Sequence, residues 1–561
     1  MSRLTIALLV AMAGCADNFD EDLKAVQEAP FLSTGGTTGG PPTTGGEHGM
    51  DPDTSTSSAG AGGDDATTDT GADATTTAGE GEGESSGGSG GILPPPAILE
   101  VDMPGKVALA GPVEFTVTTE HASSARARLD GVDIGALHDK GGGIFSGTVA
   151  VFGSVDNGPH VLEVIAEREA LSDHRSVQFV VGTPAPGSVG WVMAGPVGSH
   201  TRRIALTPER DVIEAGLKVI AGVERPVIRK RSGVDGSELW GEGTIVLDER
   251  EGRAVDVAVT PDGRMWVAMN VREAANKWRP RIVLLDANGK FLNVEVPAEA
   301  GQTVTGVDND GSGGCVAVGF VGSGLGDTDV AIWRMNGEHV PVLSGKAWDY
   351  QPAGELEAHK FTDLATDVVV NEGVAWIVGL SVGKHGDFLA TRSRGFILRV
   401  DIDTAGVLGP VIIAPDSALW TQSKFLGAAM HPDGILVTGN GCNGACDTQR
   451  VETALYTAAG ARTWFLPEDP EAAVAYGSAV ALNSHGGVAV AATIREGAAL
   501  RGFLLGRVVH GDLAMFSVPF PASKEDSEAT GVAIDAFDRV FGAGYRTFGG
   551  VTEARAVLIQ P

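Results

Sequence analysis

The stretch AVDVAVTPDGRMWVAM, residues 254–269, places an apolar strand, a Pro-Asp-Gly turn and a second apolar strand one after another. Apolar residues dominate both runs, and Pro and Gly mark a tight reversal between them, which predicts an antiparallel hairpin. The same order recurs six more times, in the stretches 202–216, 304–319, 365–379, 427–441, 477–492 and 529–544. We therefore count seven such units between residues 187 and 561.

A second kind of hairpin, with Gly in its turn, follows half a unit later. It occurs six times, in the stretches 231–240, 284–292, 332–340, 400–409, 456–465 and 506–516. Two hairpins in about fifty residues predict a four-stranded sheet in each unit, and one small sheet cannot bury both faces until its neighbours stack around a ring. The repeats therefore predict a β-propeller over residues 187–561.

These repeats resemble those of bacterial seven-bladed propellers. The segments VDGSELW (234–240) and LDANGKF (285–291) are also similar to the strand turns of quinoprotein-type blades. The resemblance implies a fold and not a chemistry, because a quinone-binding dehydrogenase of that family would carry adjacent, disulfide-linked cysteines and a calcium-ligating set. Here three residues separate Cys442 from Cys446, and no matching ligand set is visible.

The last unit supplies only three strands before the chain stops at Pro561. The segment SVGWVMAG, residues 188–195, precedes the first unit and has no partner of its own. We expect it to pair with the C-terminal unit, which would close the ring and remove two open sheet edges.

Residues 97–183 alternate between apolar and polar side chains, as in VEFTVT (113–118) and HVLEVIAE (160–167). This period of two predicts a β-sandwich. The spacing of Gly158, His160, Leu162, Val164 and Ala166 resembles a late strand of bacterial immunoglobulin-like (Ig-like) domains, which lack the inter-sheet disulfide of antibody domains. We expect His160 to have a structural role, and the alternative is that it binds a ligand. The fold class is thus all-β: a stalk, a small Ig-like sandwich and a seven-bladed propeller.

The N-terminus predicts export. Arg3 and the short apolar run from Leu4 to Met12 fit a signal peptide over residues 1–14, and the run is too short to span a bilayer. Met12-Ala13-Gly14-Cys15 resembles the lipobox of bacterial lipoproteins, which implies an acylated Cys15, although that pattern prefers Leu where Met12 stands. The alternative is an ordinary secreted protein. We therefore expect the protein to lie in the cell envelope, facing the periplasm or the exterior.

The linker between this anchor and the sandwich, residues 15–96, contains a run rich in Gly, Ser, Thr and Asp at 33–91. That run holds no large apolar residue except Met50 and no Lys or Arg, so it cannot bury a core, and it predicts a disordered stalk. The chain as a whole has a net charge of −31, which excludes nucleic acid as a partner.

Functional residues are expected on the connections between the second and third strands of each unit and on those between units, because these vary in length and emerge on one face of a propeller. Aromatic and charged side chains there suit a protein or polysaccharide ligand. The alternative is that they pack the loops themselves. The candidates are Trp278, Trp348, Tyr350, His359, His385, Asp387, Arg392, Arg394, Trp420 and Arg450.

Cysteines and acids add two smaller predictions. In an oxidising compartment Cys442 and Cys446 can close a small loop as a disulfide, while Cys315 lies in a predicted strand and is expected to be a buried thiol. The turn with Asp308, Asp310 and Ser312 imitates the start of a calcium loop, but its twelfth position is Gly319, so a blade turn is the favoured interpretation.

Two function classes remain open. The favoured one is a non-catalytic, membrane-anchored lipoprotein that presents the propeller as a binding or scaffold module, without a cofactor or metal. The other is an extracytoplasmic enzyme, a polysaccharide hydrolase or lyase or a quinoprotein-like oxidoreductase, whose groups converge over the central channel. No local catalytic motif is present, which weighs little against an enzyme assembled from several blades.

Overall fold

The computed structural model describes residues 94–560 with short gaps. The gaps are residues 109, 152–155, 184, 186, 242, 275–276, 294–301, 323–327, 339, 350–361, 384–391, 416–421, 443–448, 469–473, 484–485, 497–498, 509–515 and 521–525. The predicted signal peptide, Cys15 and nearly all of the predicted linker lie outside the described residues. In the described part of the chain, no helix is long and apolar enough to cross a membrane.

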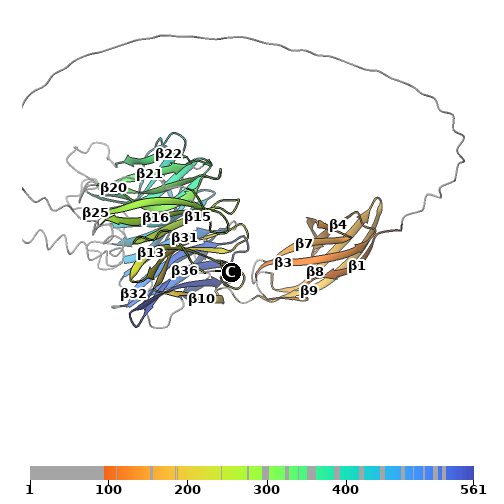
Figure 1. Ribbon diagram of the computed structural model, residues 1–561. Coiled ribbons are helices and arrows are strands. Elements are labelled where there is room, and N and C mark those ends of the chain that lie inside the picture. The colour runs from red at the N-terminus through yellow and green to blue at the C-terminus, as the bar shows by residue number, and fades with distance from the viewer. Residues whose placement is uncertain are drawn as a thin grey trace, which may run out of the picture. The chain divides into compact units, whose positions relative to one another are not determined.

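The regular elements of the described residues are all β-strands, so the all-β class is confirmed (Figure 1). The first nine strands form two sheets. One has the order β1 (Ala97–Asp102), β3 (Gly111–Glu120), β7 (Ile144–Val151) and β6 (His138–Gly141). The other has the order β2 (Lys106–Val107), β9 (Leu171–Val181), β8 (Gly158–Arg168), β4 (Ser124–Leu129) and β5 (Val132–Ala136).

A single apolar core joins these two sheets. Alternate residues of β3 are buried, as the period of two in the sequence requires. Phe115 and Phe145 from one sheet share the core with Leu162 and Phe179 from the other. The described residues of this region therefore form two packed sheets.

The rest of the described chain forms seven groups of four antiparallel strands, here named sheets I to VII. Sheet I holds β11 (Ser199–Leu206), β12 (Val212–Ile220), β13 (Val223–Arg231) and β14 (Ile245–Val246). Sheet II holds β15 (Gly252–Val259), β16 (Met265–Ala274), β17 (Lys277–Leu285) and β18 (Phe291–Asn293). Sheet III holds β19 (Gln302–Asn309), β20 (Cys315–Gly322), β21 (Thr328–Met335) and β22 (Pro341–Trp348). Sheet IV holds β23 (Thr362–Asn371), β24 (Val374–Gly383), β25 (Arg392–Asp401) and β26 (Ile412–Ile413). A single residue pair, Thr328 with Thr362, links sheets III and IV.

The remaining three sheets follow in chain order. Sheet V holds β27 (Gln422–His431), β28 (Gly434–Cys442), β29 (Gln449–Tyr456) and β30 (Arg462–Glu468). Sheet VI holds β31 (Val474–Leu482), β32 (Gly487–Glu496), β33 (Ala499–Val508) and β34 (Phe516–Pro519). Sheet VII holds β35 (Asp526–Ile534), β36 (Val540–Phe548) and β37 (Val551–Ile559), and its fourth strand is β10 (Val189–Val197).

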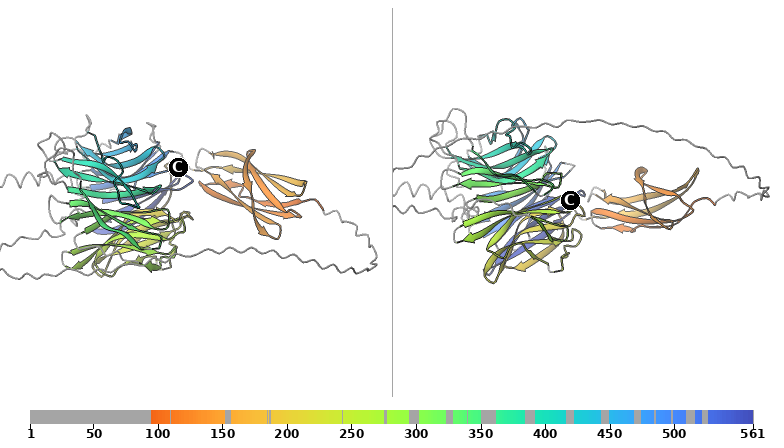
Figure 2. Two further views of the ribbon diagram at one scale, coloured as in Figure 1. Left: turned by 90° about the horizontal axis from the view of Figure 1, so that it is seen from above. Right: turned by 45° about the horizontal axis from the view of Figure 1, so that its top comes forward.

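The seven sheets close into a ring. The first strand of each sheet, counted by sequence from β11, contacts the first strand of the next, and β11 of sheet I contacts β35 of sheet VII. An apolar cluster fills each of the seven interfaces between neighbouring sheets. Figure 2 shows from two further directions that sheets adjacent in colour lie side by side. The first strands therefore line the axis of the ring.

Strand β10 joins the two ends of this ring. It pairs antiparallel with β37, with Val192 opposite Val557. Trp191 of β10 lies in the core cluster between sheets VII and I, with its ring centroid 6.2 Å from that of Phe541. Sheet VII is thus completed by the segment that precedes sheet I in the sequence.

All seven first strands share one irregularity. In each sheet the pairing between the first and second strands shifts register once, as in a β-bulge, and one residue of the first strand has no residue opposite it. The residues that resume the pairing are Arg203, Asp256, Gly306, Asp367, Gly427, Ala479 and Gly531. The same bulge, repeated in every first strand, thus carries a small residue in four sheets and a charged residue in three.

Candidate functional site

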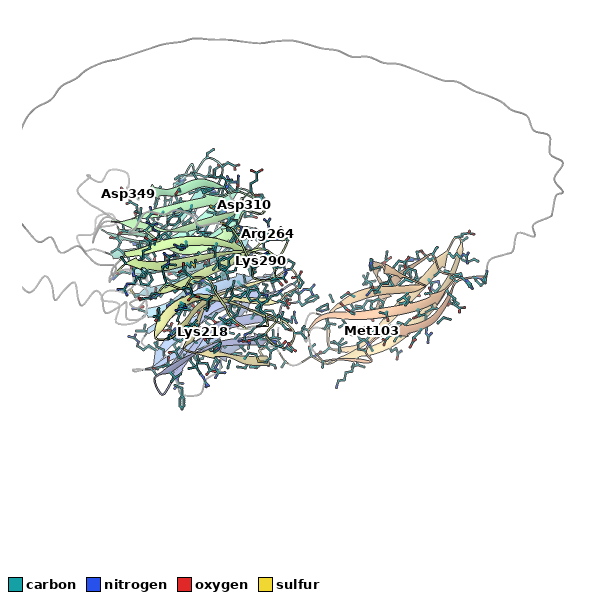
Figure 3. The ribbon with its side chains drawn as sticks, in the orientation of Figure 1. Met103, Lys218, Arg264, Lys290, Asp310 and Asp349 are labelled. Carbon is teal, nitrogen blue, oxygen red and sulfur yellow. The ribbon has the colours of Figure 1, made fainter. Side chains whose placement is uncertain are left out.

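The ring has two ends with different connections. Arg264 and Asp310 mark turns between first and second strands, and Lys290 marks a turn between third and fourth strands. Figure 3 shows these three residues toward one end of the sheets and Asp349, which follows β22 on the way to sheet IV, toward the other. We call the end that bears Asp349 the loop face.

The side chains of six of the ten predicted binding residues lie outside the described part of the chain. Outside the described residues are Tyr350, His359, His385, Asp387 and Trp420, and Arg392 is described by its backbone alone. The predictions for these six residues therefore stay predictions.

The four others are held by neighbours. Trp278 is half-buried beneath Arg253, whose guanidinium carbon is 5.6 Å from the indole centroid. Trp348 packs with its ring centroid 5.8 Å from that of Phe396, beside the core between sheets III and IV. Arg394 is buried, and its Nη1 donates to the carbonyl oxygen of Ala414. Arg450 in β29 is half-buried and lies opposite Gly441.

The cysteines and the calcium-like turn are described in part. Cys315 in β20 is a buried free thiol, and burial raises its pKa well above the ordinary value. Cys442 is buried at the end of β28 and is disulfide-bonded. Its predicted partner Cys446 lies outside the described residues, so that pairing stays a prediction.

The two carboxylates of the calcium-like turn serve different contacts. Asp308 accepts hydrogen bonds from the backbone N–H groups of Asn309 at 2.8 Å and of Val370 in sheet IV at 2.7 Å. Asp310 accepts from the backbone of its own turn, at Ser312 and Gly314. Among the described residues there is no group of three His, Cys, Asp or Glu side chains suited to a metal ion.

Half-buried polar and aromatic side chains gather where sheets VI, VII and I begin at the loop face. The centre of this group is Tyr545 in β36, which lies directly opposite Glu528 in β35. The Tyr545 ring is 4.4 Å from that of His200 in β11, centroid to centroid, and tilted by 36°. Tyr476 of β31 and Arg202 of β11 are close enough to act on Tyr545 electrostatically. We call His200, Arg202, Tyr476, Glu528 and Tyr545 the Tyr545 cluster.

Electrostatics keep the Tyr545 phenol neutral. Burial, followed by the charge of Glu528 and a hydrogen bond to its carboxylate, raises the pKa of Tyr545 well above the usual value, while Arg202 opposes the rise. The phenol therefore stays protonated and donates a hydrogen bond to the Glu528 carboxylate. The cluster combines two phenols, an imidazole, a carboxylate and a guanidinium in a half-buried setting, which suits hydrogen bonding to hydroxyl groups beside aromatic rings.

Reasoning from the sequence missed this cluster. Its five residues lie in four strands, spread from position 200 to position 545 of the sequence, and no local motif connects them. The available signal was rarity: the chain has four tyrosines, and two of them are here.

Below the cluster, the axis is occupied by Arg203. Its Nη1 donates to the carbonyl oxygens of Ser478 and Thr530, both at 2.7 Å, and its Nη2 donates to that of Leu426 at 3.1 Å. These carbonyls belong to sheets VI, VII and V. One side chain of sheet I therefore ties three other sheets together across the axis.

Asp256 and Asp367 are the acidic neighbours of Arg203. The two oxygens of Asp256 accept from the backbone N–H groups of Val257 and of Val307 in sheet III, both at 2.8 Å. Asp367 repeats this pattern with Val368 and with Ala428 of sheet V. Burial, and next the charge of Asp367, raise the pKa of Asp256 to about 7, and Arg203 lowers it. Because backbone donors occupy both oxygens of each acid, these carboxylates link sheets.

Structural neighbours of the chain are β-propeller proteins. The propeller domain of the Trilobed protease from Pyrococcus furiosus has 10% identity and a TM-score of 0.38, over 64% of this chain and 93% of that one. A quinonprotein alcohol dehydrogenase-like protein from Bacteroides thetaiotaomicron has 9% identity and a TM-score of 0.35, over 76% and 97%. Polysaccharide lyase Uly1 has 11% identity and a TM-score of 0.41, over 64% and 90%. No family model and no curated protein matches the chain.

Proposed function

We propose that the chain is an envelope lipoprotein in which a stalk and an Ig-like spacer carry a seven-bladed β-propeller. Sheets I to VII are its blades, and β10 closes the ring. Acylation at Cys15 would supply the anchor, since several acyl chains hold a protein stably at a bilayer. The function of the propeller is to recognise a polysaccharide at the loop face.

The Tyr545 cluster is the observation that carries this proposal. A sugar presents hydroxyl groups along its edge and C–H groups on its faces, which match hydrogen-bonding polar groups beside aromatic rings. Tyr545 and Glu528 are already joined by a hydrogen bond, and the His200 ring lies against Tyr545. The pre-formed arrangement reduces the entropy that binding would otherwise cost.

Recognition is favoured over catalysis by the state of the acids on the axis. Asp256 and Asp367 use both oxygens to accept backbone N–H groups, and Arg203 donates to three carbonyls. Groups committed in this way are poor general acids or bases, because a proton transfer would break contacts between sheets.

A polysaccharide array, probed with the full chain and two matched variants, tests the proposal. Tyr545→Phe keeps the ring and removes the hydroxyl, and we expect it to weaken binding about tenfold, as for one lost hydrogen bond in a half-buried site. Tyr456→Phe makes the same change in the core between sheets IV and V and should bind like the parent. Absence of any binding, or equal binding by both variants, would contradict the proposal.

A further inference from the structure

Three adjacent turns of the loop face expose apolar side chains. Exposed fractions are 67% for Val197, 41% for Val219, 37% for Val223, 64% for Phe548 and 47% for Val551. The residues lie beside the turn between β10 and β11, and at the hairpin tips of β12–β13 and β36–β37. We call these five residues the apolar tip.

Backbone contacts show that the three turns form one surface. Gly198 donates its N–H to the carbonyl oxygen of Thr552 at 2.7 Å and accepts from the N–H of Val219 at 2.7 Å. A Cβ on Gly198 would lie 3.2 Å from that of Val219. The middle turn therefore touches both hairpins, and the five apolar residues are neighbours.

Charge is missing from the turns themselves and begins in the flanking strands, where Glu224 lies opposite Val219 and Glu553 opposite Val197. No charged residue occurs in 196–199, 219–223 or 547–552, although 20% of the chain is charged. The matching stretch of sheet II, 273–277, carries Glu273 and Lys277. Both hairpins reverse through residues of positive φ, Ala221 and Gly222 in one and Gly549 and Gly550 in the other. Two-residue turns of this kind project as narrow tips.

We propose that the apolar tip docks on a lipid bilayer. Protruding aliphatic and aromatic side chains without charge can enter the interface between headgroups and acyl chains, where they need no partner of matching shape. The proposal rests on the proposed function in one respect, because acylation at Cys15 would keep the chain at such a surface. A second copy is a poorer occupant, since five partly exposed side chains are few for the roughly 800 Å² that each partner of a stable interface buries.

Flotation with vesicles tests this docking apart from the anchor. The full chain is made with Cys15→Ala, so that no acyl group contributes, and is mixed with vesicles of phosphatidylethanolamine and phosphatidylglycerol. We expect the protein to float with the vesicles. The further double substitution Phe548→Ser, Val551→Ser should reduce the vesicle-bound fraction at least tenfold, because it removes two apolar side chains from the interface.

Val340→Ser with Val342→Ser is the matched control. These valines are 52% and 44% exposed beside β21 and in β22, and the control should float like the Cys15→Ala parent. Failure of that parent to float, equal loss in both double variants, or a concentration-dependent dimer lost with Phe548 and Val551 would overturn the proposal. Polysaccharide binding by the same proteins is scored separately, so that failure of the Tyr545 cluster and failure of the apolar tip give different results.

Discussion

Arg203 and Thr530 are 327 residues apart in sequence, yet the guanidinium of Arg203 donates a 2.7 Å hydrogen bond to the carbonyl oxygen of Thr530. The contact joins sheet I to sheet VII, its neighbour in the ring, while the same guanidinium also reaches the carbonyl oxygen of Leu426 in sheet V. The first strands leave room for it, because small residues take the position of Arg203 in four of the other sheets: Gly306, Gly427, Ala479 and Gly531. One cation of sheet I can therefore donate to carbonyl oxygens of sheets V, VI and VII.

Replacing Arg203 by Met should destabilise the ring strongly. The substitution removes the cation that offsets the buried carboxylates of Asp256 and Asp367 and leaves three carbonyl oxygens without their donor. Removing one partner from a buried charge cluster costs about 3–5 kcal/mol. Chemical denaturation measures the loss. Arg264→Met is the control: Arg264 pairs with the exposed Asp262 at a turn, and the loss of that pair should cost less than about 1 kcal/mol. Similar losses in both variants would refute a special role for Arg203.

The buried Glu452 should make the free energy of unfolding fall as the pH rises, whereas the carboxylate of an ordinary ion pair makes it rise. Its side chain is 1% exposed, Oε2 has no hydrogen-bond partner, and Arg462 is 4.0 Å away. Burial raises the pKa of Glu452 to about 7, and Arg462 opposes this rise. Because the folded-state pKa lies above the unfolded value, the contribution to stability is present below pH 4.5 and is lost as the pH rises through 7.

The variant Glu452→Gln removes this titration and keeps the shape. We expect it to exceed the parent in free energy of unfolding by about 2–3 kcal/mol at pH 8, and to differ little at pH 4.5. Denaturant titrations at the two pH values measure both differences. Glu338→Gln, at an exposed turn, should shift neither. A Glu452→Gln protein that is less stable than the parent at pH 8 would disprove the explanation.

The architecture could be predicted much further than the site. The repeated hairpins predict the order of the strands observed, because alternation and turn residues act locally. The predicted second hairpin lies too early in two sheets: β14 and β26 follow the stretches 231–240 and 400–409, which hold only isolated bridges. Sheet VII explains why the first kind of hairpin occurs seven times and the second kind six times: its fourth strand is β10, which precedes all the repeats.

The site could not be predicted because it depends on ring closure. His200 and Tyr545 come into contact only when sheet I meets sheet VII, and neither lies in a loop, where candidates were sought. Arg203 follows Arg202 in a run that reads as an ordinary strand, and nothing local distinguishes the side chain that crosses the axis from its neighbour. Trp348 and Arg394 show the converse, since both were selected for their chemistry and both are held by packing or hydrogen bonds.

His160 should titrate as a structural cation. Its Nε2 lies 2.5 Å from the carbonyl oxygen of Asp156, and its Nδ1 lies 2.7 Å from the Asp130 carboxylate. These two acceptors, the Asp156 carbonyl first, raise the pKa of His160 above 6.5. The stabilisation that His160 contributes is present below 6.5 and is lost as the pH rises through the folded-state pKa. NMR titration of the imidazole should show a fall toward 6.5 in Asp130→Asn, and an unchanged titration would exclude the pairing as a cause.

The stability of the ring should depend on β10, the strand that precedes sheet I and completes sheet VII. It covers the edge of β37, Gln560 donates its N–H to the carbonyl oxygen of Ser188, and Trp191 is 9% exposed in the core between sheets VII and I. Replacing residues 188–195 by a Gly-Ser segment of equal length keeps the chain connected and removes these contacts. The exposed edge of β37 should then promote aggregation, and limited proteolysis should start in sheet VII. Trp191→Ala alone should cost about 3–5 kcal/mol, whereas Trp278→Ala, at a half-buried tip, should cost much less. A replaced segment that leaves the thermal midpoint of the ring unchanged would show that sheet VII is stable with three strands.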